Sequence, residues 1–519
     1  MNYERNEYRN RVLGCFLGKN AGGTLGMRDE WHRRINHVTY YTHEITGEPL
    51  PNDDMDIQLV WLIALEEKGI HIDARTLGDY WMYYVTPHWA EYGNCKINMR
   101  MGIQPPFSGT HNNPYTDSCG AYIRSEIWAC LAPGCPETAV SYACRDALVD
   151  HGEGEGLYAE AFCAAMESAA FVEHDIRTLI HIGLSYIPEE CAIAKAVRLA
   201  ESLYDRRVPW MEARDEILRN FLGGFIFTVS EEDRKKGFVN GRTGWEAPSN
   251  IGMIILALLY GEGDFGKTIC LAVNCGEDTD CTAATSGALL GILLGIDGIE
   301  EKWKAPIGGK LKPACLNLGE LGNLGNLLPK DIYELQERIE KLAEMVLAGC
   351  HTGMALSDQP CLFDGCRLFC EDNSRFYAGP DTARYSFDFF DIDVTFENGI
   401  SIAPFSSKKL TFTVHNRYKT SENLNIHIYG ENLQVSPSRD GLMHIPEGIW
   451  FRNRAQASFT LHWEDFPGTV CRAVAEFTTP SRAGSMLVPL IFVKDITDDC
   501  DGKTHAAKAG NISCGEEKT

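Results

Sequence analysis

Apolar residues recur every three or four positions from residue 8 to about residue 348. This period places them along one face of successive α-helices. Pro and Gly separate the helical segments, and alternation with a period of two residues is scarce in this part of the chain. The pattern predicts one large all-α domain over residues 1–349, with helices at residues 57–67, 121–131, 157–172, 193–203 and 332–347.

The pattern changes near residue 385 to an alternation of apolar and polar side chains. Such alternation is typical of half-buried strands. Several short strands separated by turn residues predict an immunoglobulin-like β-sandwich over residues 385–496. Residues 350–384 form the predicted connector, and the polar residues 497–519 a flexible tail. The predicted strands lie at residues 387–396, 410–415, 424–429, 457–463, 472–477 and 486–493.

Composition narrows the possible functions. The chain has 519 residues, of which 44% are apolar, and a net charge of −24. An acidic surface argues against a nucleic-acid partner, because phosphate backbones attract Lys and Arg. The most apolar runs, residues 251–260 and 283–296, are shorter than the ~18–20 residues of a membrane span, and the N-terminus is too polar for a signal peptide. We therefore expect a cytoplasmic protein without a membrane partner, whose 19 cysteines are mostly free thiols.

Two sets of glycines follow a four-residue spacing, which aligns each set on one face of a helix. Each glycine inside a helix costs about 1 kcal/mol relative to alanine, so several in one helix need a compensating close approach of another backbone. We expect the two sets to pack against each other as a tight helix pair and so to position the residues at the helix ends. They are Gly14, Gly18, Gly22 and Gly26, and Gly287, Gly291 and Gly295.

Aspartates gather directly before two of the predicted helices. Asp53 and Asp54 precede the helix that begins near residue 57, and Asp278 and Asp280 precede the helix of the second glycine set. Either cluster alone is explained by helix capping, which favours Asp and Asn at a helix start. Capping needs only one or two acids, however, and neighbouring carboxylates repel each other unless a cation lies between them. Oxygen ligands in pairs suit Mg²⁺, Mn²⁺ or Ca²⁺.

Two further segments are candidates for ligand binding. Small residues from Asp117 to Gly120 lead into a predicted helix, and backbone N–H groups at such a start can bind a phosphate or sugar oxygen. An ordinary loop with an Asx turn is the alternative. His151 follows Asp150 and precedes a glycine-rich stretch, where it can reach a ligand or simply make local hydrogen bonds.

Taken in order, these segments resemble the motifs of the ADP-ribosylglycohydrolase family. Its opening glycine-rich helix is matched by residues 14–26, and its T-D-D motif by residues 52–54. A segment of the type NGAAMR is matched by residues 119–124, a T-H pair by residues 150–151, and G-G-D-T-D-T by residues 276–281. The resemblance covers about residues 8–348, and the order and spacing of five motifs make it more specific than any one of them.

The resemblance implies an all-α fold with two Mg²⁺ ions in a cleft, for which Mn²⁺ is a possible replacement. It implies that the acids of the second and fifth motifs hold these ions, and that Asn52 stands in for the threonine of T-D-D. The implied metal ligands are Asn52, Asp53, Asp54, Asp278 and Asp280.

Four positions depart from the family's pattern around these acids. Cys281 and Asn52 stand where the family has threonine, Cys119 where it has asparagine, and Gly23 where it has an acid. Because the motif acids themselves are kept, we expect metal binding together with an altered substrate.

The implied activity is hydrolysis of a glycosidic bond, in which water attacks the anomeric carbon of an ADP-ribosyl or related ribosyl group. The partner would be a small-molecule or ADP-ribosylated substrate. Asp53 and Asp54 are the expected catalytic acids, and Glu44 is the expected general base, with Glu48 as a second candidate. The expected substrate-binding residues are Asp117, Ser118, Cys119, Gly120 and His151.

Three alternatives remain open. The chain could be a glycosidase for another small N- or O-glycoside, or a catalytically inactive homologue with a binding or structural role. It could also be a two-metal phosphohydrolase, since paired acids serve phosphoryl transfer as well. The β-rich region carries no catalytic signature and is a possible surface for homo-oligomer formation.

Overall fold

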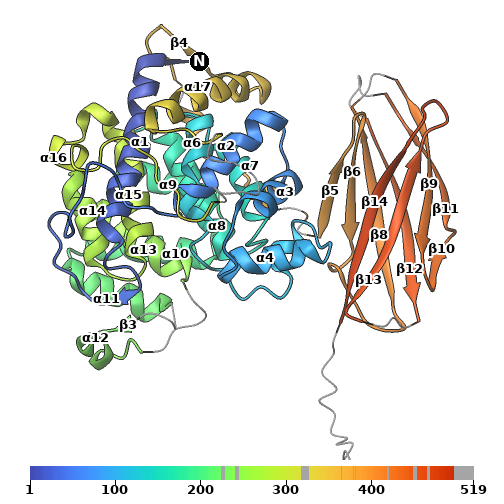
Figure 1. The fold of residues 1–519 in the computed structure, drawn as a ribbon, viewed down its shortest axis with the longest axis horizontal. Coiled ribbons are helices and arrows are strands. Elements are labelled where there is room, and N and C mark those ends of the chain that lie inside the picture. Colours follow the sequence, from blue (N-terminus) through green and yellow to red (C-terminus); the bar gives the residue numbers. More distant parts are fainter. Residues whose placement is uncertain are drawn as a thin grey trace, which may run out of the picture.

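The computed structural model describes residues 1–223, 228–239, 245–316, 327–363, 365–377, 379, 381–417, 420–447, 453–464 and 468–495. Figure 1 shows a helical body with the C-terminal strands standing beside α3 and α4. The long helices all precede residue 350, and the long strands all follow residue 381. This order confirms the predicted helical part and the predicted β-rich part. The predicted tail, residues 497–519, lies outside the described residues.

The helices match the predicted segments closely, with one exception. Residues 121–131 do not form a single helix: a 3₁₀ turn at Tyr122–Arg124 is followed by the short helix α6. The helices of this part are α1 (Arg5–Gly26), α2 (Asp56–Lys68), α3 (Ala74–Tyr84), α4 (Ala90–Arg100), α5 (Phe107–Thr110), α6 (Glu126–Leu131), α7 (Pro136–Ala147), α8 (Glu155–Ala169), α9 (Ile176–Ser185), α10 (Ala192–Asp205), α11 (Trp210–Phe221), α12 (Glu231–Lys235), α13 (Ala247–Gly261), α14 (Phe265–Asn274), α15 (Thr279–Gly298), α16 (Glu301–Lys304) and α17 (Ile332–Gly349).

Two pairs of short parallel strands accompany the helices, which the prediction of an all-α domain did not include. Strand β1 (Asn2–Glu4) pairs with β4 (Ala355–Ser357), and β2 (His32–Arg33) pairs with β3 (Thr228–Val229). Strand β4 lies in the predicted connector, which also contains the short helix α18 (Ser374–Tyr377).

Helices α1 and α15 form the close pair that the glycine spacing predicts. A Cβ atom on Gly18 would lie 2.1 Å from the carbonyl oxygen of Gly287, and one on Gly287 would lie 2.3 Å from that of Gly18. A Cβ on Gly26 would likewise lie 2.3 Å from the carbonyl oxygen of Thr279. The predicted packing of the two glycine sets is therefore confirmed, and it places the end of α1 beside the start of α15.

Helix α15 is also long and apolar enough, by length and composition alone, to cross a membrane. The apolar run at residues 283–296 lies inside this helix, which begins earlier, at Thr279, and so reaches 20 residues. Within the fold, 72% of its apolar window is buried.

The C-terminal strands form two five-stranded sheets, in the orders β10-β12-β8-β6-β5 and β11-β9-β13-β14-β7. Apolar residues of both sheets share one core, in which the rings of Phe412 and Phe477 lie 5.2 Å apart. The immunoglobulin-like type of this arrangement stays a prediction. The strands are β5 (Thr382–Ser386), β6 (Phe390–Phe396), β7 (Ser401–Ile402), β8 (Ser407–Asn416), β9 (Glu422–Gly430), β10 (Leu433–Ser436), β11 (Asp440–Ile445), β12 (Arg454–Trp463), β13 (Val470–Thr478) and β14 (Ser485–Lys494).

The segment after α4 contacts the β-rich part. Ile103 and Phe107 belong to the core of the sheets, and the ring of Phe107 lies 5.2 Å from that of Phe396 in an edge-to-face contact. The guanidinium of Arg472 donates a hydrogen bond of 2.9 Å to the carbonyl oxygen of Met101. One end of α4 is thereby anchored to the sheets, while its other end reaches the site described next.

Candidate functional site

The start of α15 presents two buried carboxylates. Glu277 precedes them in a left-handed conformation with φ of 69°, which is uncommon for a residue with a Cβ. A buried ion pair of 2.6 Å between Arg33 and Glu277 holds this turn in place. Asp278 occupies the N-cap position, yet its side chain makes no capping hydrogen bond. Helix capping therefore does not explain why an aspartate stands there.

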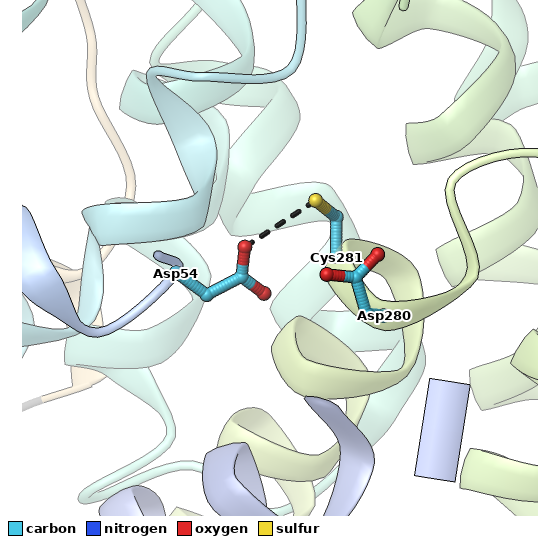
Figure 2. Close-up of side chains that lie close together, drawn as sticks. All are labelled: Asp54, Asp280 and Cys281. Carbon is cyan, nitrogen blue, oxygen red and sulfur yellow. Dashed lines mark hydrogen bonds between the residues drawn. The ribbon is translucent and has the colours of Figure 1, made fainter. Parts of the chain in front are cut away.

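The second acid cluster lies directly against the first. Figure 2 shows Asp54 facing Asp280 and Cys281 across the gap between the segment before α2 and the start of α15. The thiol of Cys281 lies 3.3 Å from Oδ1 of Asp54. The N-cap of α2 is Met55, so neither Asp53 nor Asp54 caps that helix. Residues more than two hundred positions apart are thus brought together by the α1–α15 pair.

Asn52 connects the two clusters. Its carbonyl oxygen accepts the N–H of Asp54 at 2.7 Å, and its amide donates to Oδ2 of Asp280 at 3.3 Å. In this orientation the side chain positions two acids rather than offering an oxygen to an ion. Its role as a metal ligand stays a prediction, one that requires the amide to turn.

The donor atoms of these residues suit a cation. Ligand atoms of Asp54, Asp280 and Cys281 lie within 4.8 Å of one another, and so do those of Glu30, Asp278 and Asp280. Among the described residues, Oδ2 of Asp54 and Oδ1 of both Asp278 and Asp280 are buried without a hydrogen-bond partner. Buried carboxylate oxygens without partners are costly, and a divalent cation is what would compensate them.

Charge repulsion among the acids of the cluster also favours a bound cation. Burial and the neighbouring Asp280 raise the pKa of Asp53 to about 6. Burial raises the pKa of Asp54 well above its usual range, and the positive charge of Lys19 offsets this only in part. The Lys19 amine donates to Glu126 at 2.7 Å, so its charge is shared with another acid.

A cavity of about 340 Å³ adjoins the acid cluster. Its polar wall includes the carboxylates of Glu30, Asp53, Glu91 and Asp278. Its apolar wall is aromatic, with Trp31, Trp89, Tyr92 and Trp245. The arrangement of a few polar groups in an otherwise apolar concavity is typical of small-molecule sites.

A chain of buried side chains ends on Glu91 at this cavity. Arg124 forms an ion pair of 2.7 Å with Asp150, which lies 3.0 Å from Nδ1 of His151. Nε2 of His151 lies 2.9 Å from the hydroxyl of Ser118. Burial raises the pKa of the neighbouring Glu91, and His151 and Ser118 offset this rise in part. Burial opposes the charge on His151, but the Asp150 carboxylate still raises its pKa.

The predicted substrate-binding residues divide into two groups. Cys119 and Gly120 line the cavity. Ser118 and His151 are buried behind Glu91, and Asp117 accepts the N–H of Glu155 at 3.1 Å. Direct substrate contact by these three stays a prediction.

The two carboxylates proposed as general bases lie away from the cavity wall. Glu44 is exposed, and Glu48 forms ion pairs with Lys310 and Lys312 at 3.2 and 2.6 Å. The role of Glu44 stays a prediction, while Glu30 and Glu91 are the carboxylates that the sequence analysis did not single out. The position of Glu30 directly after the first glycine helix was a usable signal, whereas Glu91 has none in its local sequence.

Comparison with known proteins confirms the resemblance to a family. Residues 4–350 match the family model described as ADP-ribosylglycohydrolase. No curated protein matches the chain. Similar solved structures include an ADP-ribosylglycohydrolase-related protein complex, at 20% identity and a TM-score of 0.40, covering 66% of this chain and 99% of that one. A FixG-related protein from Vibrio parahaemolyticus matches at 12% identity and a TM-score of 0.18, covering 21% of this chain and 100% of that one.

Proposed function

Because this chain belongs to the ADP-ribosylglycohydrolase family, whose members are hydrolases, we propose that it hydrolyses the anomeric bond of an ADP-ribosyl or related ribosyl substrate at a site with two Mg²⁺ ions. The observation that carries this proposal is the cluster of buried, unpartnered carboxylate oxygens beside an open cavity. Mn²⁺ suits the same oxygen donors.

The ions would be held by the acids that converge at the start of α15. Asp54 and Asp280 supply one group of donors, and Asp278 joins Asp280 in the other, with Glu30 beside them. Asp53 lines the cavity beside them. Divalent ions bound there would act as Lewis acids that orient sugar hydroxyls and offset developing negative charge.

The protein's own side chains supply the remaining chemistry. The water oxygen forms a bond to the anomeric carbon as the glycosidic bond breaks, and the leaving group takes the bonding electron pair. The carboxylate of Glu30 accepts the proton of that water, because it reaches both the acid cluster and the cavity. Glu91 faces the ring and stabilises its oxocarbenium character.

The proposal predicts a metal-dependent activity that fails when Asp278 is changed. Purified protein with Mg²⁺ is assayed for release of free sugar from a panel of ADP-ribosylated protein and small ribosyl glycosides. Asp278→Asn is expected to lower kcat/KM by about 100-fold or more, since it removes a negative charge from the site. The matched control is Asp297→Asn, an exposed acid near the other end of the same helix.

Other outcomes of this assay separate the alternatives. Full activity of Asp278→Asn, or in the presence of a chelator, would contradict the proposal. Release of phosphate rather than sugar would identify a phosphohydrolase. Binding of Mg²⁺ without turnover of any substrate would indicate a binding or structural homologue.

A further inference from the structure

The cavity beside the acid cluster carries features that bear on the class of substrate. We propose that it takes an uncharged ribosyl glycoside with a planar aglycone, and that the carboxylate of Glu91 excludes phosphorylated ligands. This inference rests on the proposed function and names its substrate class. It follows from three features of the cavity wall.

The first feature is the position of Glu91 against the segment where a phosphate is expected. A Cβ atom on Gly120 would lie only 2.1 Å from Oε1 of Glu91, so the carboxylate lies directly against Gly120 at the end of the predicted phosphate-binding segment. Oε2 of Glu91 is buried and has no hydrogen-bond partner among the described residues. A phosphate placed here would meet an acceptor of its own charge rather than backbone N–H donors.

Glu91 is held firmly in this position. It is only 6% exposed, and its side chain lies against Gly120 and beside Ser118. Ser118 in turn contacts His151, which pairs with Asp150. Because the surrounding groups are buried and closely packed, the Glu91 side chain has little room to turn away from the cavity.

The second feature is the sign of the charge around the cavity. Within the described part of the chain, the cavity is lined by four carboxylates, those of Glu30, Asp53, Glu91 and Asp278, and by no Lys, Arg or His. Recognition of a diphosphate relies on Arg, Lys or free backbone N–H groups. Bound ions would offset the charges of Asp53 and Asp278, so the described wall offers a phosphate group the negative charge of Glu91 and no cationic side chain.

The third feature is the group of exposed aromatic side chains at the cavity. Trp31 and Trp89 are 45% and 55% exposed, and the rings of Trp31 and Trp245 lie 5.9 Å apart. Large exposed aromatic rings beside a polar site are suited to stacking on a planar group. The volume, about 340 Å³, is near the lower end of the ~300–1,000 Å³ found for small-molecule sites.

The backbone holds these rings in strained positions. Trp31 has φ of 60°, and Ala90, directly after Trp89, has φ of 42°. Backbone hydrogen bonds to Glu277 and Thr228 keep Trp31 in this conformation, at 3.1 and 3.0 Å. Left-handed residues with a Cβ persist where the surrounding structure requires them, and they concentrate at ligand sites.

The test compares three probes by calorimetry on the full chain with Mg²⁺ present: a phenyl C-ribofuranoside, a methyl C-ribofuranoside and ADP-ribose. C-glycosides have no bond that the enzyme can hydrolyse, so the heats report binding alone. We expect the phenyl compound to bind about tenfold more tightly than the methyl compound, because stacking of one ring on a tryptophan adds binding energy of that size. We expect ADP-ribose to bind most weakly of the three. ADP-ribose binding as tightly as the phenyl compound, or equal binding of the two C-glycosides, overturns the inference.

Substitutions test which residues cause these binding preferences. Glu91→Gln keeps the shape and removes the charge, so it is expected to tighten ADP-ribose binding by about tenfold. The control is Glu190→Gln, whose carboxylate is 88% exposed. Trp89→Ala is expected to abolish the preference for the phenyl compound, with Tyr83→Ala, 75% exposed, as its control.

The results of these binding experiments can be distinguished from a failure of the proposed function. ADP-ribose binding that does not tighten in Glu91→Gln contradicts the exclusion role. If that variant fails to fold, the order of the three probes' affinities for the unmodified chain still tests the inference. Failure to hydrolyse any glycoside refutes the proposed function without changing this order.

Discussion

At the residue scale, Cys281 is the departure from the family's pattern with the clearest chemical consequence. Its sulfur lies among the carboxylate oxygens of Asp54 and Asp280. A thiol is a poor ligand for Mg²⁺ and a good one for zinc. We predict that Cys281→Thr raises the affinity for Mg²⁺ relative to Zn²⁺ by about tenfold, the size of effect seen when groups around a metal are altered.

Calorimetric titration with each metal measures this ratio. Co²⁺ provides a second readout, because a thiolate–cobalt absorption band is expected in the unmodified chain and should be lost in Cys281→Thr. Cys119→Ser is the control, since Cys119 lines the same cavity but is not part of either ligand group. An unchanged metal preference in Cys281→Thr would show that the sulfur does not reach the ion.

Two other departures from the family's pattern are coupled to each other. A Cβ atom on Gly23 would lie 2.7 Å from the amide nitrogen of Asn52. The amide therefore occupies space that a larger residue at position 23 would need. Asn52 and Gly23 are best understood as one compensating pair that keeps Asp54 and Asp280 in position.

At the scale of elements, the α1–α15 pair determines whether the site exists. We predict that Gly18→Ala destabilises the helical part by roughly 1–3 kcal/mol, the usual cost of overpacking, even though alanine favours the helix. The added methyl would overlap the backbone of Gly287. Chemical unfolding followed by helical circular dichroism measures the change.

The control for this prediction is Gly365→Ala. No atom lies within 4 Å of the position that its Cβ would take, so little effect is expected. Gly18→Ala with the stability of the unmodified chain would mean that α1 and α15 can separate without penalty.

At the scale of the whole molecule, the β-rich part is connected to the cavity through α4. Phe107, in α5 shortly after the C-terminal end of α4, is inserted into the core of the sheets, while Glu91 at the N-terminal end of α4 lines the cavity. We predict that Phe107→Ala separates the thermal unfolding of the two parts, because a buried Phe→Ala change costs about 3–5 kcal/mol. Differential scanning calorimetry should then resolve two transitions.

Phe405→Ala is the control, since this ring belongs to the β-rich part and is 70% exposed. A single transition with an unchanged midpoint in Phe107→Ala would show that the contact does not couple the two parts. Whether the sheets also mediate a homo-oligomer stays a prediction.

The sequence by itself determined the positions of the helices and strands and the acidic residues of the motifs. Helical period, two-residue alternation and turn residues depend on neighbours in the chain, so the predicted helices and strands reappear at nearly the same bounds. The exception, residues 121–131, is where the side chain of Arg124 is buried and paired with Asp150, a contact distant in sequence. Motif order likewise singled out Asp53, Asp54, Asp278 and Asp280, which the structure brings together beside the cavity.

Only the tertiary structure decided which groups share the cavity. Glu30, Glu91 and the tryptophans come from segments without a shared spacing, and they meet because residues after α1, at the start of α4 and before α13 and α15 line one cavity. The same packing moved Glu44 and His151 away from the cavity wall. The local sequence pattern predicts which helices and strands a segment forms, because these depend on neighbouring residues. Burial and charge repulsion depend on residues far apart in the chain, so the chemical properties of the site were decided by the tertiary structure.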